Sequence, residues 1–203
     1  MAITISGNDK GLPSSAWRSG APIQSAWGYN ISSASKIFGE YGRWEEVPGR
    51  LECTLTPSGL NNIVVVTVHL AWGGWNRSST TVGTESGTDV ALNFRIFKDT
   101  GSGPQNFGTY ASPEFDPPNN TGGGVATGTY KYNQGDNNSS WDSDDILMYD
   151  TVSSLNQTRY ALFWNCGYSP SRTLYWNKAI NHLGQNSYNP VHTCMISAIE
   201  YKA

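Results

Sequence analysis

Short stretches in which apolar and polar residues alternate recur along the chain, and this alternation predicts β-strands. Leu51, Cys53 and Leu55 alternate with polar neighbours and are followed by the turn sequence Pro-Ser-Gly at 57–59. The same period of two is present at residues 90–96, 128–132 and 159–166, and residues 173–176 predict a further short strand. Residues 63–70 (IVVVTVHL) place apolar side chains on both faces, which is typical of a strand covered on both sides.

Residues 194–201 (CMISAIEY) form the last predicted strand, and they are apolar on both faces. Alternate positions put Cys194, Ile196 and Ala198 on one face and, on the other, Met195, Ile199 and Tyr201. An outer strand of an isolated sandwich has one wet face. We therefore expect Met195, Ile199 and Tyr201 to pack against neighbouring subunits, while the opposite face packs in the core.

Turn-forming residues separate these strands, and helical periodicity is weak. The best helix candidate is the short segment 151–156, and residues 99–145 hold Gly, Pro, Asn, Asp and Ser at high density. Several strands separated by turn signals predict an all-β fold, with an antiparallel sandwich or jelly roll in residues 21–203.

The first 20 residues differ from the rest of the chain. Ile3 and Ile5 suggest a strand-like start, and the turn-forming sequence Gly-Leu-Pro-Ser-Ser follows at 11–15. This N-terminal arm, residues 1–20, either pairs with another chain or forms an edge strand of the same sandwich. The sequence leaves both alternatives open.

Composition narrows the function classes. Charged residues make up 14% of the 203 residues and the net charge is −3, without the clustered Lys and Arg of a nucleic-acid-binding protein. No apolar run approaches the roughly 18 residues of a membrane span, and the N-terminus lacks the pattern of a signal peptide. We expect synthesis in a cytoplasm, no membrane insertion and no nucleic-acid partner.

The three cysteines are expected to be buried. Cys53, Cys166 and Cys194 are far apart and lie in predicted strands, so we expect each of them to act as a small buried hydrophobic residue.

Motifs of catalysis are not found in the sequence. The segment 83–87 (GTESG) has its serine one place too late for a nucleophile elbow, and His69, His182 and His192 lack ligand spacing. The acidic residues Asp136, Asp142, Asp144 and Asp145 crowd one predicted loop, but they do not follow the EF-hand pattern, so a solvated acidic loop is expected there. We predict a protein without catalytic residues, metal or cofactor.

Exposed aromatic residues are the clearest hint of a ligand. Trp72, Trp75 and Asn76 lie just past a predicted strand, and Trp141 lies in the acidic segment. Flat aromatic faces beside polar side chains suit sugar rings. The alternative is that these tryptophans cap the sandwich or fill a subunit interface, where Trp and Tyr are also enriched.

The segment LECTLTPSGLNNIVVVTVHLAWGGWN contains a Thr-x-Thr-Pro step, followed by a polar turn and a strand rich in Val and Ile. The end of the chain contains TRYALFWNCG, RTLYWNKA and HTCMISAIEY, and GAPIQSAWG lies near residue 20. These segments resemble the C-terminal head or knob domains of tail-fibre-like virion proteins, especially those of marine bacteriophages. The C-terminal segments resemble the end of these domains, and GAPIQSAWG resembles their beginning.

The resemblance implies a jelly-roll-like sandwich that is trimeric about an axis, and it implies no catalytic residues. We accordingly expect a bacteriophage virion protein, a homotrimeric fibre or knob that attaches to the host surface. Its partners would be its own copies, other virion proteins through the arm at 1–20, and a host-surface glycan. A capsid decoration protein and a carbohydrate-binding module are the alternatives.

Overall fold

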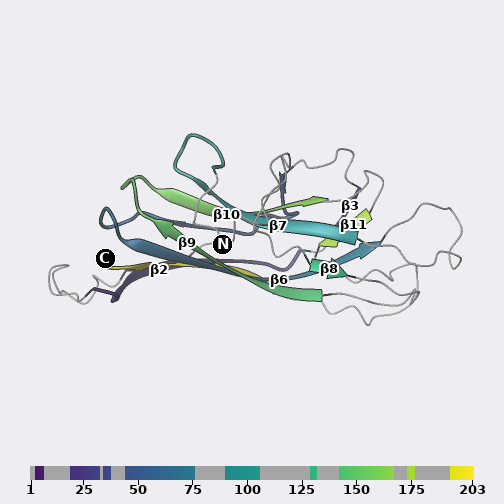
Figure 1. Cartoon of the computed structure of the whole chain (residues 1–203), viewed down its shortest axis with the longest axis horizontal. Coiled ribbons are helices and arrows are strands. Elements are labelled where there is room, and N and C mark those ends of the chain that lie inside the picture. Colours follow the sequence, from purple (N-terminus) through teal and green to yellow (C-terminus); the bar gives the residue numbers. More distant parts are fainter. Residues whose placement is uncertain are drawn as a thin grey trace, which may run out of the picture.

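The computed structural model describes residues 3–6, 19–32, 34–37, 44–75, 90–105, 129–131, 142–166, 173–176 and 193–203. The regular secondary structure within these ranges consists of β-strands alone (Figure 1). In chain order they are β1 (Ile3–Ser6), β2 (Pro22–Asn30), β3 (Ala34–Ile37), β4 (Glu45–Glu46), β5 (Glu52–Leu55), β6 (Ile63–Trp75), β7 (Val90–Asp99), β8 (Thr129–Lys131), β9 (Asp142–Thr151), β10 (Thr158–Cys166), β11 (Thr173–Trp176) and β12 (Cys194–Tyr201).

The strands form two antiparallel sheets that pack as a β-sandwich (Figure 1). Sheet A has seven strands in the order β1-β2-β12-β6-β11-β3, and β9 pairs with the other edge of β6. Sheet B has five strands in the order β4-β10-β7-β8, and β5 pairs with β10 beside β4. The last strand of the sequence, β12, therefore lies inside sheet A between β2 and β6.

Inward side chains of both sheets form the core. On β6 the residues Val64, Val66, Val68 and Leu70 are fully buried, as the period-two pattern of residues 63–70 predicts. At one end of the core, the Trp176 ring of sheet A packs edge-on against Trp164 of sheet B, with ring centroids 6.3 Å apart. Aromatic pairs favour this geometry, and rings of this size bury large apolar areas.

Gly28 allows the two sheets to approach closely. A Cβ atom at this position of β2 would overlap the carbonyl oxygen of Glu52 in β5. A residue with a side chain would push β5 away from sheet A, so the packing depends on glycine at this position.

Most of the strand predictions agree with the structure. The predicted strands around 51–55, 63–70, 90–96, 159–166, 173–176 and 194–201 are present as β5, β6, β7, β10, β11 and β12. The predicted helix at 151–156 is wrong, because Thr151 ends β9 and residues 152–157 form an irregular connection. The prediction that both faces of 63–70 are covered is also wrong within one copy. On the second face, Val65 and Thr67 are only half-buried and His69 is exposed.

The N-terminal residues form an edge strand in the same sheet. β1 pairs with β2 in the register Ile3 with Trp27 and Ser6 with Gln24. Of the two alternatives for the arm, pairing with another chain or forming an edge strand of the same sandwich, Ile3–Ser6 adopts the edge strand. Attachment to other virion proteins through residues 1–20 stays a prediction.

Candidate interaction surface

The outward side chains of β2, β12, β6 and β9 form a continuous surface on sheet A. Residues paired across antiparallel strands point to the same side of the sheet, so the register divides this surface into four rows. The rows are Tyr29, Met195, His69 and Asp145; Trp27, Ser197, Thr67 and Leu147; Ser25, Ile199, Val65 and Tyr149; and Tyr201, Ile63 and Thr151. We call these fifteen residues the outer face of sheet A.

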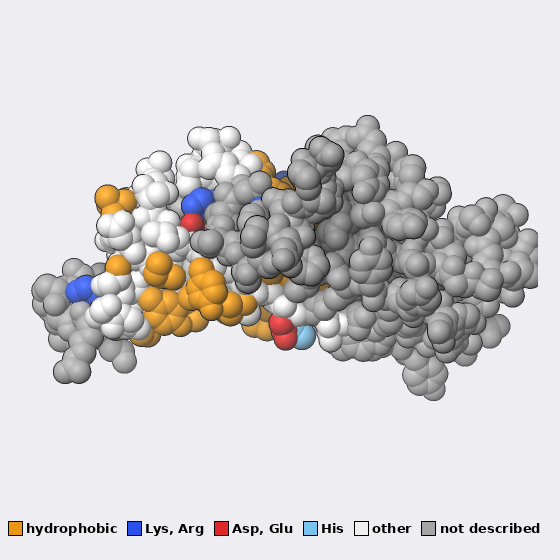
Figure 2. All heavy atoms as spheres, viewed as in Figure 1, with side chains coloured by type: hydrophobic (Ala, Val, Ile, Leu, Met, Phe, Trp, Pro, Cys, Tyr) orange, Lys and Arg blue, Asp and Glu red, His pale blue; other side chains and the backbone are white. Residues whose placement is uncertain are grey.

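Large apolar side chains are exposed on this face. The exposed fractions are 41% for Tyr29, 53% for Leu147, 55% for Tyr149 and 45% for Met195. Figure 2 shows hydrophobic side chains gathered in the region that β9 crosses in Figure 1, bordered by an acidic side chain and a histidine. The other exposed large hydrophobic residues of the described chain, Ile31, Leu60 and Leu155, lie in connections between strands. The exposed apolar side chains that share one surface are those of sheet A.

The face combines aromatic flanks with small residues at its centre. The rings of Trp27 and Tyr29 on β2 lie 6.1 Å apart with an interplanar angle of 30°. The neighbouring positions on β12 and β6 hold Ser197 and Thr67, whose short side chains leave room for an incoming side chain. Aromatic residues and methionine are enriched in protein interfaces, whereas Lys, Glu and Asp are depleted.

One corner carries the charged side chains of the face. His69 Nδ1 lies 2.7 Å from Asp145 Oδ1, and both side chains are largely exposed. An exposed pair of this kind contributes little stability. The rest of the outer face holds no ionisable side chain except the phenols of Tyr29, Tyr149 and Tyr201.

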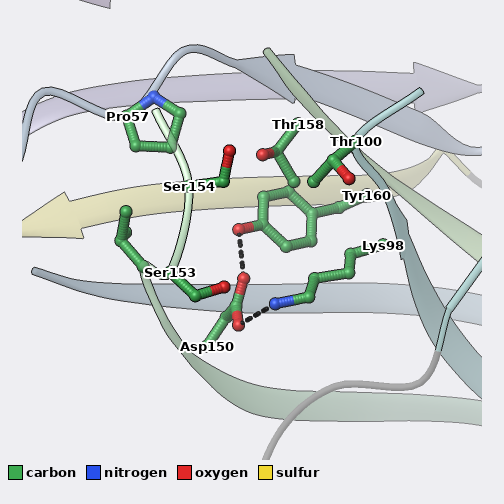
Figure 3. A pocket seen from close by; sticks show the side chains of 9 residues that line it. Pro57, Lys98, Thr100, Asp150, Ser153, Ser154, Thr158 and Tyr160 are labelled. Atoms are coloured by element: carbon green, nitrogen blue, oxygen red, sulfur yellow. Dashed lines mark hydrogen bonds and ion pairs between the residues drawn. The ribbon is translucent and has the colours of Figure 1, made fainter. Parts of the chain in front are cut away.

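The buried polar groups of the sandwich form a second feature. Lys98 Nζ of β7 donates to Asp150 Oδ1 of β9 at 2.7 Å, and the Tyr160 hydroxyl of β10 donates to Asp150 Oδ2 at 2.8 Å (Figure 3). Burial and then the neighbouring Asp150 carboxylate raise the pKa of the Tyr160 phenol above its ordinary value. Both oxygens of Asp150 are thus engaged, and the cluster links sheet A to sheet B.

A small cavity adjoins this cluster (Figure 3). It is lined by Lys98, Asp150, Tyr160, Ser153 and Thr158, among others, and its volume is about 10 Å³. That volume is close to the space of a single water molecule. The cavity can hold a bridging water but no organic substrate.

Glu200 is a fully buried carboxylate that fixes the end of β12. It accepts hydrogen bonds from the Ser58 amide at 2.9 Å, the Ser58 hydroxyl at 3.0 Å and Asn62 Nδ2 at 2.7 Å. Gln24 Nε2 of β2 also donates to it. Because several donors surround the carboxylate, its burial is compensated. These bonds hold β12, β2 and the turn before β6 in one register, which positions the outer face.

Sheet B carries a polar and aromatic cluster on its own outward side. Arg159 of β10 donates to Glu52 Oε2 at 2.6 Å and to Glu46 Oε1 at 2.7 Å. The Phe97 and Phe163 rings lie beside it in the sheet, 4.7 Å apart. The arginine is held by two carboxylates that belong to neighbouring strands, so this cluster joins β4, β5 and β10.

The structure places the three predicted interface residues on one face. Met195, Ile199 and Tyr201 all point outward from β12, whereas Cys194, Ile196 and Ala198 are buried in the core. The alternation predicted for this strand is confirmed. Their burial between subunits stays a prediction.

Of the four predicted glycan contacts, the structure describes only the backbones of two. The backbones of Trp72 and Trp75 belong to β6, where Trp72 pairs with Trp176 and Trp75 with Thr173. Their side chains, and the whole of Asn76 and Trp141, lie outside the described residues. A glycan site at these four residues remains a hypothesis.

The expected acidic loop is a strand in part. Asp142, Asp144 and Asp145 belong to β9 and pair with Trp72, Leu70 and His69 of β6. Alternation along β9 sends Asp145 outward to His69 and Asp150 inward to Lys98. The prediction of a loop at these three positions is wrong, because the apolar residues that follow hold the segment in the sheet. The Asp145 side chain is exposed to solvent, as expected. Asp136 lies outside the described residues.

Four large apolar members of the outer face, Trp27, Tyr29, Leu147 and Tyr149, were not predicted from the sequence. The contiguous run Ile146 to Tyr149 does not alternate in polarity, so it gave no sign that two of its members face outward. A usable signal lay in residues 22–30, where small residues and Asn30 alternate with Trp27 and Tyr29.

The buried cysteines agree with expectation where the structure describes them. Cys53 and Cys194 are both fully buried in the core and have free thiols. Burial, reinforced by the charge of Glu52, raises the pKa of Cys53 to about 12, and burial raises that of Cys194 to about 11. The side chain of Cys166 lies outside the described residues.

No protein-family model matches the chain, and no curated protein matches it at a significant level. In the described part of the chain, no helix is long and apolar enough to cross a membrane.

Proposed function

We propose that this chain is a bacteriophage virion structural protein that acts by assembly and attachment rather than by catalysis. The observation that carries the proposal is the outer face of sheet A. Several large apolar side chains exposed together on one face, bordered by polar residues, are typical of an interaction site. The resemblance of residues 51–76 and of the C-terminal segments to tail-fibre-like head domains supplies the class of particle.

The use of the buried polar groups supports a role without catalysis. Asp150, Lys98 and Tyr160 satisfy one another across the two sheets. Glu200 is surrounded by donors from β2 and from the turn before β6. Such closed sets of contacts stabilise a rigid scaffold, which suits a particle that must survive outside a cell.

In this proposal the sandwich has jelly-roll connectivity and forms a homotrimeric fibre or knob. Host-surface attachment is assigned to the end of the sandwich near Trp72 and Trp75. The N-terminal residues connect the trimer to other virion proteins. A capsid decoration protein would share the assembly role but would not bind the host.

The test starts from purified particles of the source phage. Mass spectrometry of the particles and labelling with an antibody against this chain should place it in the virion, at a tail or fibre tip. Pre-incubation of host cells with the recombinant protein should reduce phage adsorption. Absence of the chain from particles would overturn the proposal, whereas uniform labelling of the capsid would replace the fibre with a decoration protein. Glycan binding by a soluble monomer that is absent from particles would favour the carbohydrate-binding module.

A further inference from the structure

We propose that Lys98 and Asp150 become joined after folding by an isopeptide bond between Lys98 Nζ and Asp150 Cγ. The ion pair seen in the structure is the reactant, in which Nζ lies 2.7 Å from Asp150 Oδ1. The bond ties β7 of sheet B to β9 of sheet A. It is a single event within one chain, and it does not depend on the proposed function.

The strand registers direct three side chains toward one point between the sheets. Lys98 and Tyr160 are partners across β7 and β10, so both point to the same side of sheet B. Asp150 is the partner of the fully buried Val64 on β6 and points inward from sheet A. Figure 3 shows the Asp150 carboxylate between the Lys98 ammonium and the Tyr160 hydroxyl. Well-oriented groups held at contact distance react with effective molarities that reach about 10⁵–10⁸ M.

Burial favours the neutral forms that amide formation needs. In water an amine and a carboxylic acid exchange a proton and remain separate ions. Here the side chains of Lys98 and Asp150 are 15% and 7% exposed, and keeping two charges out of water is costly. Transfer of one proton from Nζ to Oδ1 gives a neutral amine beside a neutral carboxylic acid. Formation of the amide then removes both ionisable groups from the interior.

The reaction balances without an added reagent. Nζ attacks Asp150 Cγ, and negative charge develops on Oδ2, to which the Tyr160 hydroxyl donates at 2.8 Å. Burial and then the Asp150 carboxylate raise the pKa of the Tyr160 phenol, so this donor keeps its proton. A second proton passes from Nζ to Oδ1, the Cγ–Oδ1 bond breaks, and Oδ1 leaves as water. One ammonium and one carboxylate thus give one amide and one water molecule.

The small cavity beside the pair provides a place for the released water. Its volume of about 10 Å³ is close to the space of a single water molecule. Its lining includes Ser153, which is exposed, and Ser154, which is half-buried, so the cavity leads toward the surface. The water formed at Oδ1 can occupy this cavity and leave through it.

The test measures the intact mass of the folded, full-length protein by mass spectrometry, during incubation for hours to days at neutral pH. The wild-type mass should fall below the mass of the sequence by one water molecule. After digestion with trypsin, tandem mass spectrometry should find the peptide that contains Lys98 joined to the peptide that contains Asp150.

Two variants separate this bond from other losses of water. Lys98→Arg keeps a cation beside Asp150, but a guanidinium stays protonated and does not attack, so this variant should keep its full mass. Tyr160→Phe keeps the ion pair and removes the donor to Oδ2, so the bond should form roughly 100-fold more slowly. An unchanged rate in Tyr160→Phe would overturn the part assigned to that hydroxyl.

Two results would overturn the bond itself. The first is a wild-type protein of full mass with no joined peptide, whether or not the chain is found in virions. The second is a loss of water that persists in Lys98→Arg, which would assign the loss to cyclisation of an aspartate elsewhere in the chain. Should Lys98→Arg fail to fold, the presence or absence of the joined peptide in the wild type decides the question.

Discussion

Lys98 Nζ and Asp150 Oδ1 lie 2.7 Å apart and form an ion pair between the two sheets of the sandwich. The side chains are 15% and 7% exposed, so the pair is largely removed from water. Such a pair is costly to break, although its net contribution against an apolar replacement is small.

Removing one member of this pair should destabilise the protein strongly. Asp150→Ala leaves the Lys98 ammonium without its carboxylate, and we expect the free energy of unfolding to fall by about 3 kcal/mol. The double variant Lys98→Met with Asp150→Leu should lose less than Asp150→Ala, because no buried charge remains. Urea denaturation of the wild type, Asp150→Ala, the single variants Lys98→Met and Asp150→Leu, and the double variant measures these differences. A double variant that is as unstable as the sum of its single variants would show that the pair is not coupled.

Glu200→Gln should be more damaging than its small chemical change suggests. The new amide nitrogen would face donors from Ser58, Asn62 or Gln24, so at least one buried donor would lose its acceptor. We expect a loss of about 3 kcal/mol in the free energy of unfolding. Glu52→Gln is the matched control, since Glu52 is about one-third exposed and pairs with Arg159 near the surface. Its cost should be below about 1 kcal/mol, and equal costs for the two variants would contradict the role given to Glu200.

The sequence predicted those parts of the fold that depend on alternation. β6 and β12 were predicted because their inward positions are apolar apart from Glu200, and the two faces of Cys194–Ile199 were assigned correctly. β9 was missed because its first residues are acidic and its next four are all apolar, so neither the composition of a strand nor a period of two is visible. The partner of Asp150 could not be predicted from the sequence, since Lys98 lies 52 positions away and meets it only through the packing of the two sheets.

Most of the outer face could not be predicted from the sequence either, because its residues come from strands that are far apart in the chain. Met195, Ile199 and Tyr201 were identified because a strand with two apolar faces needs two covers. Apart from Ser197, the remaining members come from β2, β6 and β9, and only the register brings Tyr29, Met195 and His69 into one row. Pairing between strands far apart in sequence is set by tertiary packing, which local patterns do not encode.

Alkaline pH should destabilise the protein through its buried thiols. The folded-state pKa values of Cys53 and Cys194 are raised from 9.0 to about 12 and about 11. The unfolded chain therefore loses these protons first. The stabilising contribution is fully present below pH 9 and is lost as the pH rises toward the folded-state values. Each thiol should lower the free energy of unfolding by about 1.4 kcal/mol per pH unit in that window.

Cys53→Ala provides the check on this pH dependence. In reducing buffer, its free energy of unfolding should fall less steeply than that of the wild type between about pH 9.5 and 11, by about 1.4 kcal/mol per pH unit. Cys194→Ala should show a similar flattening that ends near pH 11. Slopes identical to the wild type in both variants would mean that these thiols ionise in the folded protein as easily as in the unfolded chain.

Deletion of residues 1–18 separates the structural role of the N-terminal residues from their proposed attachment role. β1 is a four-residue edge strand, whereas β2 keeps its pairing with β12 over Pro22–Asn30. The backbone bonds from the Gly20 amide to the Lys202 carbonyl and from the Lys202 amide to the Ala21 carbonyl also remain. We therefore expect a cooperative melt with a Tm lowered by about 2–4 °C, which corresponds to roughly 1 kcal/mol in a chain of this size. In a phage that carries only the truncated copy, mass spectrometry should find no chain in purified particles. A non-cooperative melt would show that β1 is required for the fold, and normal incorporation would move the attachment site to another part of the surface.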